Sequence, residues 1–141
     1  MLFRSPRAGA REGHQASIAV LPFVNMSGDP EQDYFSDGIT EDIITDLSKI
    51  SSLFVVSRNI SFSFKGAGED LGRVASRLGV QYLLEGSVRK VKDRVRITAK
   101  LIDGRTNGHV WAERYDRKLE DIFELQDAIS HAIVEIGRAH V

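Results

Sequence analysis

Residues 17–23 read Ser-Ile-Ala-Val-Leu-Pro-Phe, a short apolar run that is typical of a buried β-strand. Pro22 has no amide hydrogen to give to a neighbouring strand, so the strand is expected to stop there. A turn cluster follows at 25–30, then a stretch with helical periodicity, then a second strand candidate at 53–57. A strand, a helix and a strand in this order predict a β-α-β unit with parallel strands and a right-handed crossover.

The helix expected between these strands begins near Asp33. Its apolar residues recur at helical spacing and its acidic residues are interleaved on the other side, which is the pattern of an amphipathic helix. Gly38 lies inside this pattern and costs about 1 kcal/mol relative to alanine, so a start at Thr40, with Thr40 as the N-cap, is the alternative. The apolar positions are Phe35, Ile39, Ile43, Leu47 and Ile50, and the acidic positions are Asp37, Glu41, Asp42 and Asp46.

The second half of the chain predicts a helix, three strands and a last helix. Asp70 is placed to cap the first of these helices, and Gly79 follows it where a left-handed C-terminal cap favours glycine. Short connections at 92–93 and 107–108 predict that the three strands form an antiparallel meander. The strands are expected at 81–90, 94–103 and 109–116, and the last helix carries Ile122, Leu125, Ile129 and Ile133 on one stripe.

The expected fold class is α+β, built as a two-layer α/β sandwich. The element order β-α-β-α-β-β-β-α is best arranged as one mixed sheet of about five strands with helices mainly on one face. Alternation is clearest in the strand at 94–103, where one set of side chains is apolar and the other is polar. The apolar set is Val95, Ile97, Ala99 and Leu101, and the polar set is Arg94, Arg96, Thr98 and Lys100.

Four stretches together carry a family resemblance. They are residues 17–41, with Asp-Tyr-Phe-Ser-Asp-Gly-Ile-Thr-Glu at 33–41; Leu-Gly-Val-Gln-Tyr-Leu-Leu-Glu-Gly-Ser-Val at 78–88; Val-Arg-Ile-Thr-Ala-Lys-Leu-Ile-Asp at 95–103; and Gly-His-Val-Trp-Ala-Glu-Arg-Tyr-Asp-Arg at 108–117. This set resembles the bacterial accessory domain that is similar to the amino-terminal part of the translocation protein TolB, also described as FlgO-like. The resemblance implies the same architecture. It also implies a module found beside nucleotide cyclase or winged-helix domains and ahead of tetratricopeptide repeats.

The two ends of the chain are expected to lie outside this domain. Leu2-Phe3-Arg4-Ser5 and the last six residues, Ile-Gly-Arg-Ala-His-Val, can both be encoded by the inner parts of short-read sequencing adapters. Segments of such an origin are set aside in fold reasoning. A natural basic leader and a frayed tail are the alternative. We therefore expect a leader over 1–16, a TolB amino-terminal-like domain over 17–135 and a tail over 136–141.

Composition limits the class of protein. A chain of 141 residues fits one domain. Its 19 basic and 20 acidic residues give a formal net charge of −1, so no whole-molecule field draws it to nucleic acid or an anionic membrane. The absence of cysteine excludes a disulfide scaffold and a thiolate site, and leaves both cytoplasm and periplasm open. No apolar run approaches the ~20 residues of a membrane-spanning helix.

The residues that could serve in catalysis or metal binding do not match the spacing of known sites. The acidic group Asp29, Glu31, Asp33 and Asp37 fails the calcium-loop spacing, so helix capping is the plainer account. The histidines at 14, 109, 131 and 140 stand apart from one another and from carboxylates at ligand spacing. Gly66-Ala67-Gly68 precedes a helix without a phosphate-binding fingerprint and predicts a flexible turn. We expect no catalytic residue, metal or cofactor.

A basic run gives the strongest charge signal. Arg94, Arg96 and Lys100 alternate along one strand and should form a basic stripe on the sheet face away from the helices. The plainer interpretation is a solvated face whose cations are neutralised by carboxylates on neighbouring strands. The run also contains Arg89, Lys90 and Lys92, and the expected carboxylates are Glu85, Glu113 and Asp116. Phosphate or nucleic-acid binding is the alternative, and balanced charge without interleaved aromatic residues makes nucleic acid the weaker choice.

Trp111 and Tyr115 are the aromatic candidates for an interaction surface. Both point to one face of their strand together with Glu113. A charged residue between them indicates a face that is only partly covered. Packing between elements is the favoured interpretation, and a patch for a partner is the alternative.

The hypothesis for function is a noncatalytic docking or sensing module of a larger bacterial signalling protein, either cyclase-like or similar to a transcriptional regulator. Its partners are expected to be neighbouring domains of the same polypeptide or another protein. A second hypothesis makes the chain the regulatory segment of a nucleotide cyclase whose catalytic domain lies elsewhere. The interaction-surface candidates are Arg94, Arg96, Lys100, Trp111 and Tyr115.

Overall fold

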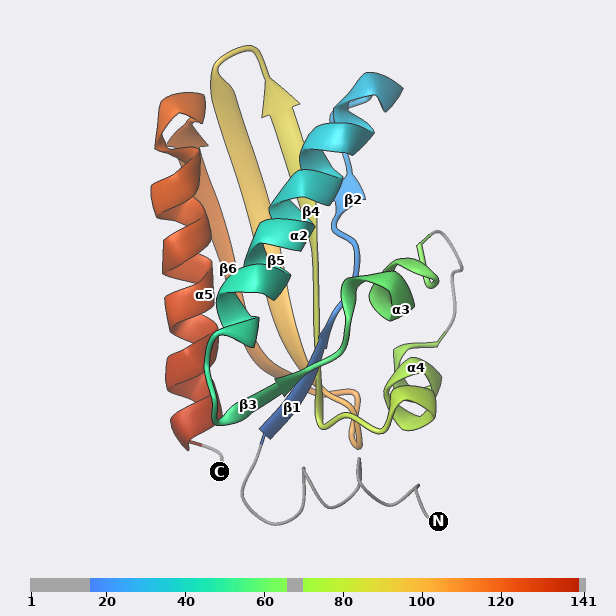
Figure 1. Ribbon diagram of the computed structural model, residues 1–141. Helices are drawn as coiled ribbons and strands as arrows, with labels where there is room; N and C mark the ends of the chain where they lie inside the picture. The colour runs from blue at the N-terminus through green and yellow to red at the C-terminus, as the bar shows by residue number, and fades with distance from the viewer. Residues whose placement is uncertain (1–15, 66–69, 140–141) are drawn as a thin grey trace.

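One mixed sheet runs through the molecule, with strands in the order β3-β1-β4-β5-β6 and β2 also paired to β4 (Figure 1). The structure is a computed structural model that describes residues 16–65 and 70–139. Its strands are β1 (Ala16–Val20), β2 (Val24–Asn25), β3 (Leu53–Val55), β4 (Tyr82–Val91), β5 (Arg94–Asp103) and β6 (His109–Lys118). Its helices are α2 (Asp33–Ser48), α3 (Arg58–Phe62), α4 (Leu71–Leu78) and α5 (Ile122–Ala139), with short 3-10 turns η1 (Pro30–Gln32) and η2 (Leu119–Asp121). The expected α+β class is confirmed.

The sheet is parallel near its beginning and antiparallel in its second half. β1 pairs in parallel with β3 on one side and with β4 on the other, as the predicted β-α-β unit requires. β4, β5 and β6 form the predicted antiparallel meander. Figure 1 shows α2 and α5 side by side over one face of the sheet, while α3 and α4 lie near its parallel end.

The helix α2 begins at Asp33, so the alternative start at Thr40 is wrong. Gly38 lies inside the helix, and a Cβ at this position would meet no atom within 4 Å, so no close contact requires glycine here. Burial of the apolar stripe outweighs the propensity cost of one glycine. Ile43 and Leu47 of that stripe are both 0% exposed.

Two apolar clusters lie on opposite faces of the sheet. The larger one joins α2 and α5 to the sheet and includes Ile43, Ile97 and Ile129. The smaller one joins α4 to the other face and includes Val74 and Leu83. The parallel strands are thus covered on both sides, whereas much of the meander is covered only by the two long helices.

Two short elements were absent from the expected order. One is β2, which resumes pairing with β4 after the chain leaves it at Pro22: the Leu21 amide donates to Leu84 and the Met26 amide donates to Val88. The other is α3, a single helical segment of five residues. Elements this short carry too few residues to show a period in the sequence.

The break at Pro22 is fastened to α2 by one buried hydrogen bond. The Phe23 amide donates to Thr40 Oγ1 at 2.9 Å, and the same hydroxyl donates to the carbonyl of Ser36 at 3.1 Å. Thr40 and Phe23 are 0% and 2% exposed. An unpaired amide at this depth would lose its hydrogen bond to water without a replacement.

We therefore expect Thr40→Val to destabilise the protein by about 1–3 kcal/mol, because the isosteric side chain leaves the Phe23 amide without an acceptor. Thr45→Val is the matched control, since Thr45 is an exposed threonine of the same helix. Chemical denaturation of both variants measures the difference. Equal losses in the two variants would contradict this role of the Thr40 hydroxyl.

Both predicted caps of α4 are confirmed. The Asp70 side chain accepts from the Gly72 amide, and Gly79 adopts the left-handed conformation with φ of 68°. An L-residue with a side chain rarely adopts that φ, which is why glycine suits the position.

The expected domain limits fall near the limits of the described residues. Most of the leader expected over 1–16, and Gly66-Ala67-Gly68, lie outside them. The tail expected over 136–141 begins inside α5, which continues to Ala139, and Ile136 packs against the larger apolar cluster. The adapter origin of the ends stays a prediction. None of the helices over 16–65 and 70–139 combines the length and the apolar character needed to span a membrane.

Candidate functional site

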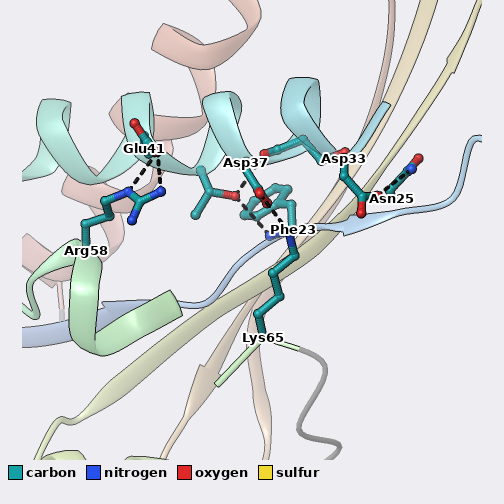
Figure 2. A network of polar contacts seen from close by, with 9 residues as sticks. Phe23, Asn25, Asp33, Asp37, Glu41, Arg58 and Lys65 are labelled. Atoms are coloured by element: carbon teal, nitrogen blue, oxygen red, sulfur yellow. Dashed lines mark hydrogen bonds and ion pairs between the residues drawn. The ribbon is translucent and has the colours of Figure 1, made fainter. Parts of the chain in front are cut away.

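A row of polar contacts runs along α2 and ties it to the segments around it (Figure 2). Asp33 accepts from Asn25 Nδ2 at 2.8 Å. Asp37 pairs with Lys65 at 2.7 Å and Glu41 pairs with Arg58 at 2.7 Å. The acidic residues of the helix therefore hold β2, α3 and the end of the following turn in place.

A cavity of about 240 Å³ lies beside this row, between β2 and the first turns of α2. Ser36 Oγ and Asp37 Oδ1 are buried there and accept no hydrogen bond from any described residue. Phe23 and Pro22 form an apolar wall, and Lys65 already neutralises Asp37 through its other oxygen. Ordered water is sufficient to satisfy two such acceptors.

Three of the four acidic residues that the sequence placed near the helix start, Asp29, Asp33 and Asp37, have structural roles. Asp29 caps η1 by accepting from the Glu31 amide. Asp33 and Asp37 make the contacts above. Across residues 16–65 and 70–139, no group of three or more His, Cys, Asp or Glu side chains is arranged to hold a metal ion.

One histidine departs from the expectation. His131 was expected to stand apart from carboxylates, but its Nε2 atom lies 3.9 Å from Glu135 Oε2, one turn further along α5. Both side chains are mostly exposed, and such pairs contribute little to stability. His14 and His140 lie outside the described residues.

The second candidate region is the face of β4, β5 and β6 that points away from α2 and α5, called here the open face. The register sets its membership: Arg96 lies opposite Arg89 on one side and Asp116 on the other, and Lys100 lies opposite Glu85 and Ala112. The buried residues of β5 alternate with these positions, as predicted. The open face comprises Glu85, Ser87, Arg89, Val91, Arg94, Arg96, Thr98, Lys100, Ala112, Arg114, Asp116 and Lys118.

The open face is strongly basic. It carries six cations and two carboxylates in a chain whose net charge is −1. The cations are Arg89, Arg94, Arg96, Lys100, Arg114 and Lys118, and the carboxylates are Glu85 and Asp116. Positive charge is therefore concentrated on this side, although the whole molecule is nearly neutral.

The sequence prediction of this face needs one correction. The sequence predicts that Glu113 neutralises the cations of the basic stripe. In the structure Glu113 lies opposite Ala99, on the side of the sheet that α2 and α5 cover. Arg114 takes the open-face position beside Thr98 instead. Arg114 and Lys118 were missed, although alternation along β6 combined with the hairpin register would have found both.

Among the carboxylates that the structure describes, Asp116 is the one that pairs directly with the basic stripe. Arg96 Nε donates to Asp116 Oδ1 at 2.7 Å, and Arg114 Nε lies 4.0 Å from the other oxygen. The hydrogen bond from Arg96, followed by the charges of Arg96, Arg114 and Arg94, holds the pKa of Asp116 below its ordinary value.

We expect Arg96→Gln to raise the pKa of Asp116 toward its ordinary value, because both the charged hydrogen bond and the nearest positive charge are lost. A carboxyl-carbon NMR titration measures this. Arg105→Gln is the control, since Arg105 pairs with Asp103 outside the open face. An unchanged Asp116 titration in Arg96→Gln would contradict the pairing.

Trp111 and Tyr115 lie on the opposite side of β6 from the open face. They face Leu101 and Ile97, and both pack against the larger apolar cluster while remaining partly exposed. Burial and the neighbouring Glu113 raise the pKa of Tyr115. The structure thus separates the expected surface residues: Arg94, Arg96 and Lys100 share one face, and the two aromatic residues share the other.

Residues 14–132 match the family model of the HilA/YgeH-like transcriptional regulator, second domain. A protein of Rhizobium meliloti (strain 1021) named "Putative adenylate cyclase 3" is 66% identical over 122 residues. The match covers 86% of this chain and 21% of that relative. The chain therefore spans about a fifth of the relative's length.

Several solved structures share the fold at low identity. TolB from Acinetobacter baumannii matches with a TM-score of 0.63 and 17% identity, over 88% of this chain and 28% of TolB. Lipoprotein GNA1162 from Neisseria meningitidis matches with a TM-score of 0.61 and 20% identity, over 84% of this chain and 96% of that protein. The LpoB C-terminal domain from Salmonella enterica gives 0.57 and 16%, over 81% and 91%. The predicted resemblance to the TolB amino-terminal-like domain is confirmed.

Proposed function

We propose that this chain, which belongs to the family of HilA/YgeH-like transcriptional regulator second domains, works as a noncatalytic docking module within a larger bacterial signalling protein. The observation that carries the proposal is the extent of the match to the Rhizobium relative. High identity extends over 86% of this chain but only 21% of that protein. A segment that forms one domain of a much longer polypeptide is held close to the neighbouring domains, so these are the partners that we expect it to contact first.

The open face is the surface we assign to docking. Two long helices cover the other side of the meander, so the outward side chains of β4 to β6 are the part of the sheet left to contact another element. Rows of charge on such a face fix the orientation and specificity of a partner more than its raw affinity.

Nucleotide assays test the noncatalytic part of the proposal. We expect the purified chain to turn over neither ATP nor GTP and to show no micromolar affinity for either, which would correspond to about −8 kcal/mol. Cyclic-nucleotide production by the chain alone would overturn the proposal. The matched segment of the relative, removed from that protein, is a suitable parallel sample.

Regulation of a nucleotide cyclase is the narrower form of this proposal. The name of the Rhizobium relative supports it, since the matched segment leaves most of that protein for other domains. Deleting the segment from the relative should then change the rate of cyclic-nucleotide formation without abolishing the activity. Complete loss of activity in a well-folded deletion variant would favour a catalytic contribution.

Phosphate or nucleic-acid binding is the second candidate, and the six cations of the open face favour it. Binding of this kind falls steeply with salt concentration, because each phosphate contact releases counterions. Salt-dependent DNA binding that Arg94→Glu with Arg96→Glu abolishes would establish it. Absence of binding to DNA, to RNA and to inorganic phosphate at low salt would reject it.

A further inference from the structure

We infer that the open face binds an acidic, amphipathic protein segment, with its carboxylates over the cations of β5 and β6 and its apolar side chains against the β2 side. This inference rests on the proposed docking function and adds the chemistry of the partner. Three features of the surface carry it: the charge excess, an apolar rim, and the position of the aromatic residues.

The charge excess selects an acidic partner. Among residues 16–65 and 70–139, Asp116 is the only carboxylate that forms a close ion pair with any of the six cations, through Arg96 at 2.7 Å. The other carboxylate, Glu85, lies at the far end of the face opposite Lys100. An acidic segment laid across the face would replace water around the cations with carboxylates, and a basic segment would be repelled.

An apolar rim borders the cations along β2 and the end of β4. Val24 and Met26 are each 57% exposed, and Val91 is 54% exposed. Val24 lies opposite Ser87 in the register, so it joins the open face. Val24 and Met26 form the apolar side of a hollow of about 210 Å³, and its other lining residues are Glu85, Gly86, Ser87, Thr98 and Lys100. Such a hollow is suited to one apolar anchor of a partner.

The rim favours protein over nucleic acid as the partner. Apolar side chains beside a basic field match a segment with one apolar side and one acidic side. Nucleic-acid surfaces that bind single strands use aromatic residues among the cations for base stacking. Here Trp111 and Tyr115 lie on the opposite side of β6, packed against the core.

The source of the segment is the same polypeptide. The match occupies 21% of the Rhizobium relative, so most of that protein lies outside the segment equivalent to this chain. Tethering within one chain raises the effective concentration of such a segment to the millimolar range, so a surface with micromolar affinity would be almost fully occupied. The partner is therefore an acidic amphipathic stretch in the part of the relative outside the match.

The test is a peptide array that tiles the relative outside the matched segment in overlapping 20-residue peptides, with the 141-residue chain as the probe. We expect the bound peptides to be net acidic with apolar residues on one side. Arg89→Glu with Lys100→Glu should weaken their binding about tenfold or more, a loss of about 1.4 kcal/mol per factor of ten. Met26→Asp should weaken it several-fold through the rim.

Two control variants keep the test specific. Lys49→Glu reverses one exposed charge on the α2 side, and Tyr34→Asp removes a side chain of α2 that is 89% exposed. Both should bind the peptides as the wild type does, and all variants should melt at similar temperatures. Binding of basic peptides, no binding by any peptide, or equal losses in the controls would overturn the inference.

The array also separates this inference from the proposed docking function. If the chain binds the rest of the relative but none of the acidic peptides, the inference fails and docking stands. If a 20-base-pair DNA duplex binds, responds to Lys100→Glu and ignores Met26→Asp, the face serves nucleic acid and the inference fails.

Discussion

Replacing Ile129 with aspartate is expected to destabilise the protein by about 4–5 kcal/mol, the largest loss among the substitutions considered. Ile129 is 0% exposed and belongs to the cluster that joins α5 to α2 and the sheet. The change replaces the three buried carbons beyond Cβ with a carboxyl group, which must either lose its hydration or take up a proton. Chemical denaturation near pH 7 measures the loss.

The same helix supplies the control. Asp127 is exposed two residues earlier, so Asp127→Lys should change stability by less than about 0.5 kcal/mol. The penalty of Ile129→Asp should shrink as the pH falls from 7 toward about 4, because burial raises the pKa of the new carboxyl above its unfolded value; below about pH 4 both states are protonated and the charge cost is absent. Similar losses in the two variants would mean that α5 presents a different side to the core.

Replacing Gly86 with alanine is the second large effect, with an expected loss of about 3 kcal/mol. A Cβ at Gly86 would overlap the carbonyl oxygen of Thr98 and lie 2.7 Å from Phe23 Cε2. The oxygen belongs to the sheet backbone and the Phe23 ring is buried beside the Pro22 break, so neither group can move cheaply. The absence of a side chain is thus what lets the ring lie against β4.

Gly38→Ala is the matched control for this substitution. A Cβ at Gly38 meets no atom within 4 Å, and alanine is the better helix former. We expect Gly38→Ala to stabilise the protein by up to about 1 kcal/mol, opposite in sign to Gly86→Ala. Thermal melts of the two variants compare them directly. An unchanged melting temperature in Gly86→Ala would contradict the packing described around Phe23.

The elements predicted correctly from the sequence are those with several periods or an explicit cap. β5 alternates over its full length, α2 and α5 each carry a long apolar stripe, and Asp70 and Gly79 mark both ends of α4. The sequence pattern allows two starts for α2, at Asp33 and at Thr40, because Gly38 lies between them. Burial of the apolar stripe in the folded protein sets the start at Asp33, and helix propensity alone does not predict this burial.

The features that the sequence left out depend on contacts between distant residues. β2 exists because β4 continues beyond the Pro22 break, and α3 is too short to show a period. The two faces of β6 follow from its register with β5, which placed Glu113 on the helix side and Arg114 on the open face. Val24 and Met26 of the apolar rim lie beside residues of β4 that are more than sixty positions away in the sequence. The Lys90 amide, for example, donates a hydrogen bond to Ser27 Oγ across 63 residues.

The most direct test of docking is calorimetric titration of the 141-residue chain into the Rhizobium relative from which the matched segment has been deleted. We expect saturable binding with a dissociation constant in the micromolar range, about −8 kcal/mol, and loss of at least a factor of ten in Arg89→Glu with Lys100→Glu. Lys49→Glu should bind as the wild type does. No detectable binding by a folded wild-type chain, or equal affinity in the open-face variant, would contradict docking through this face.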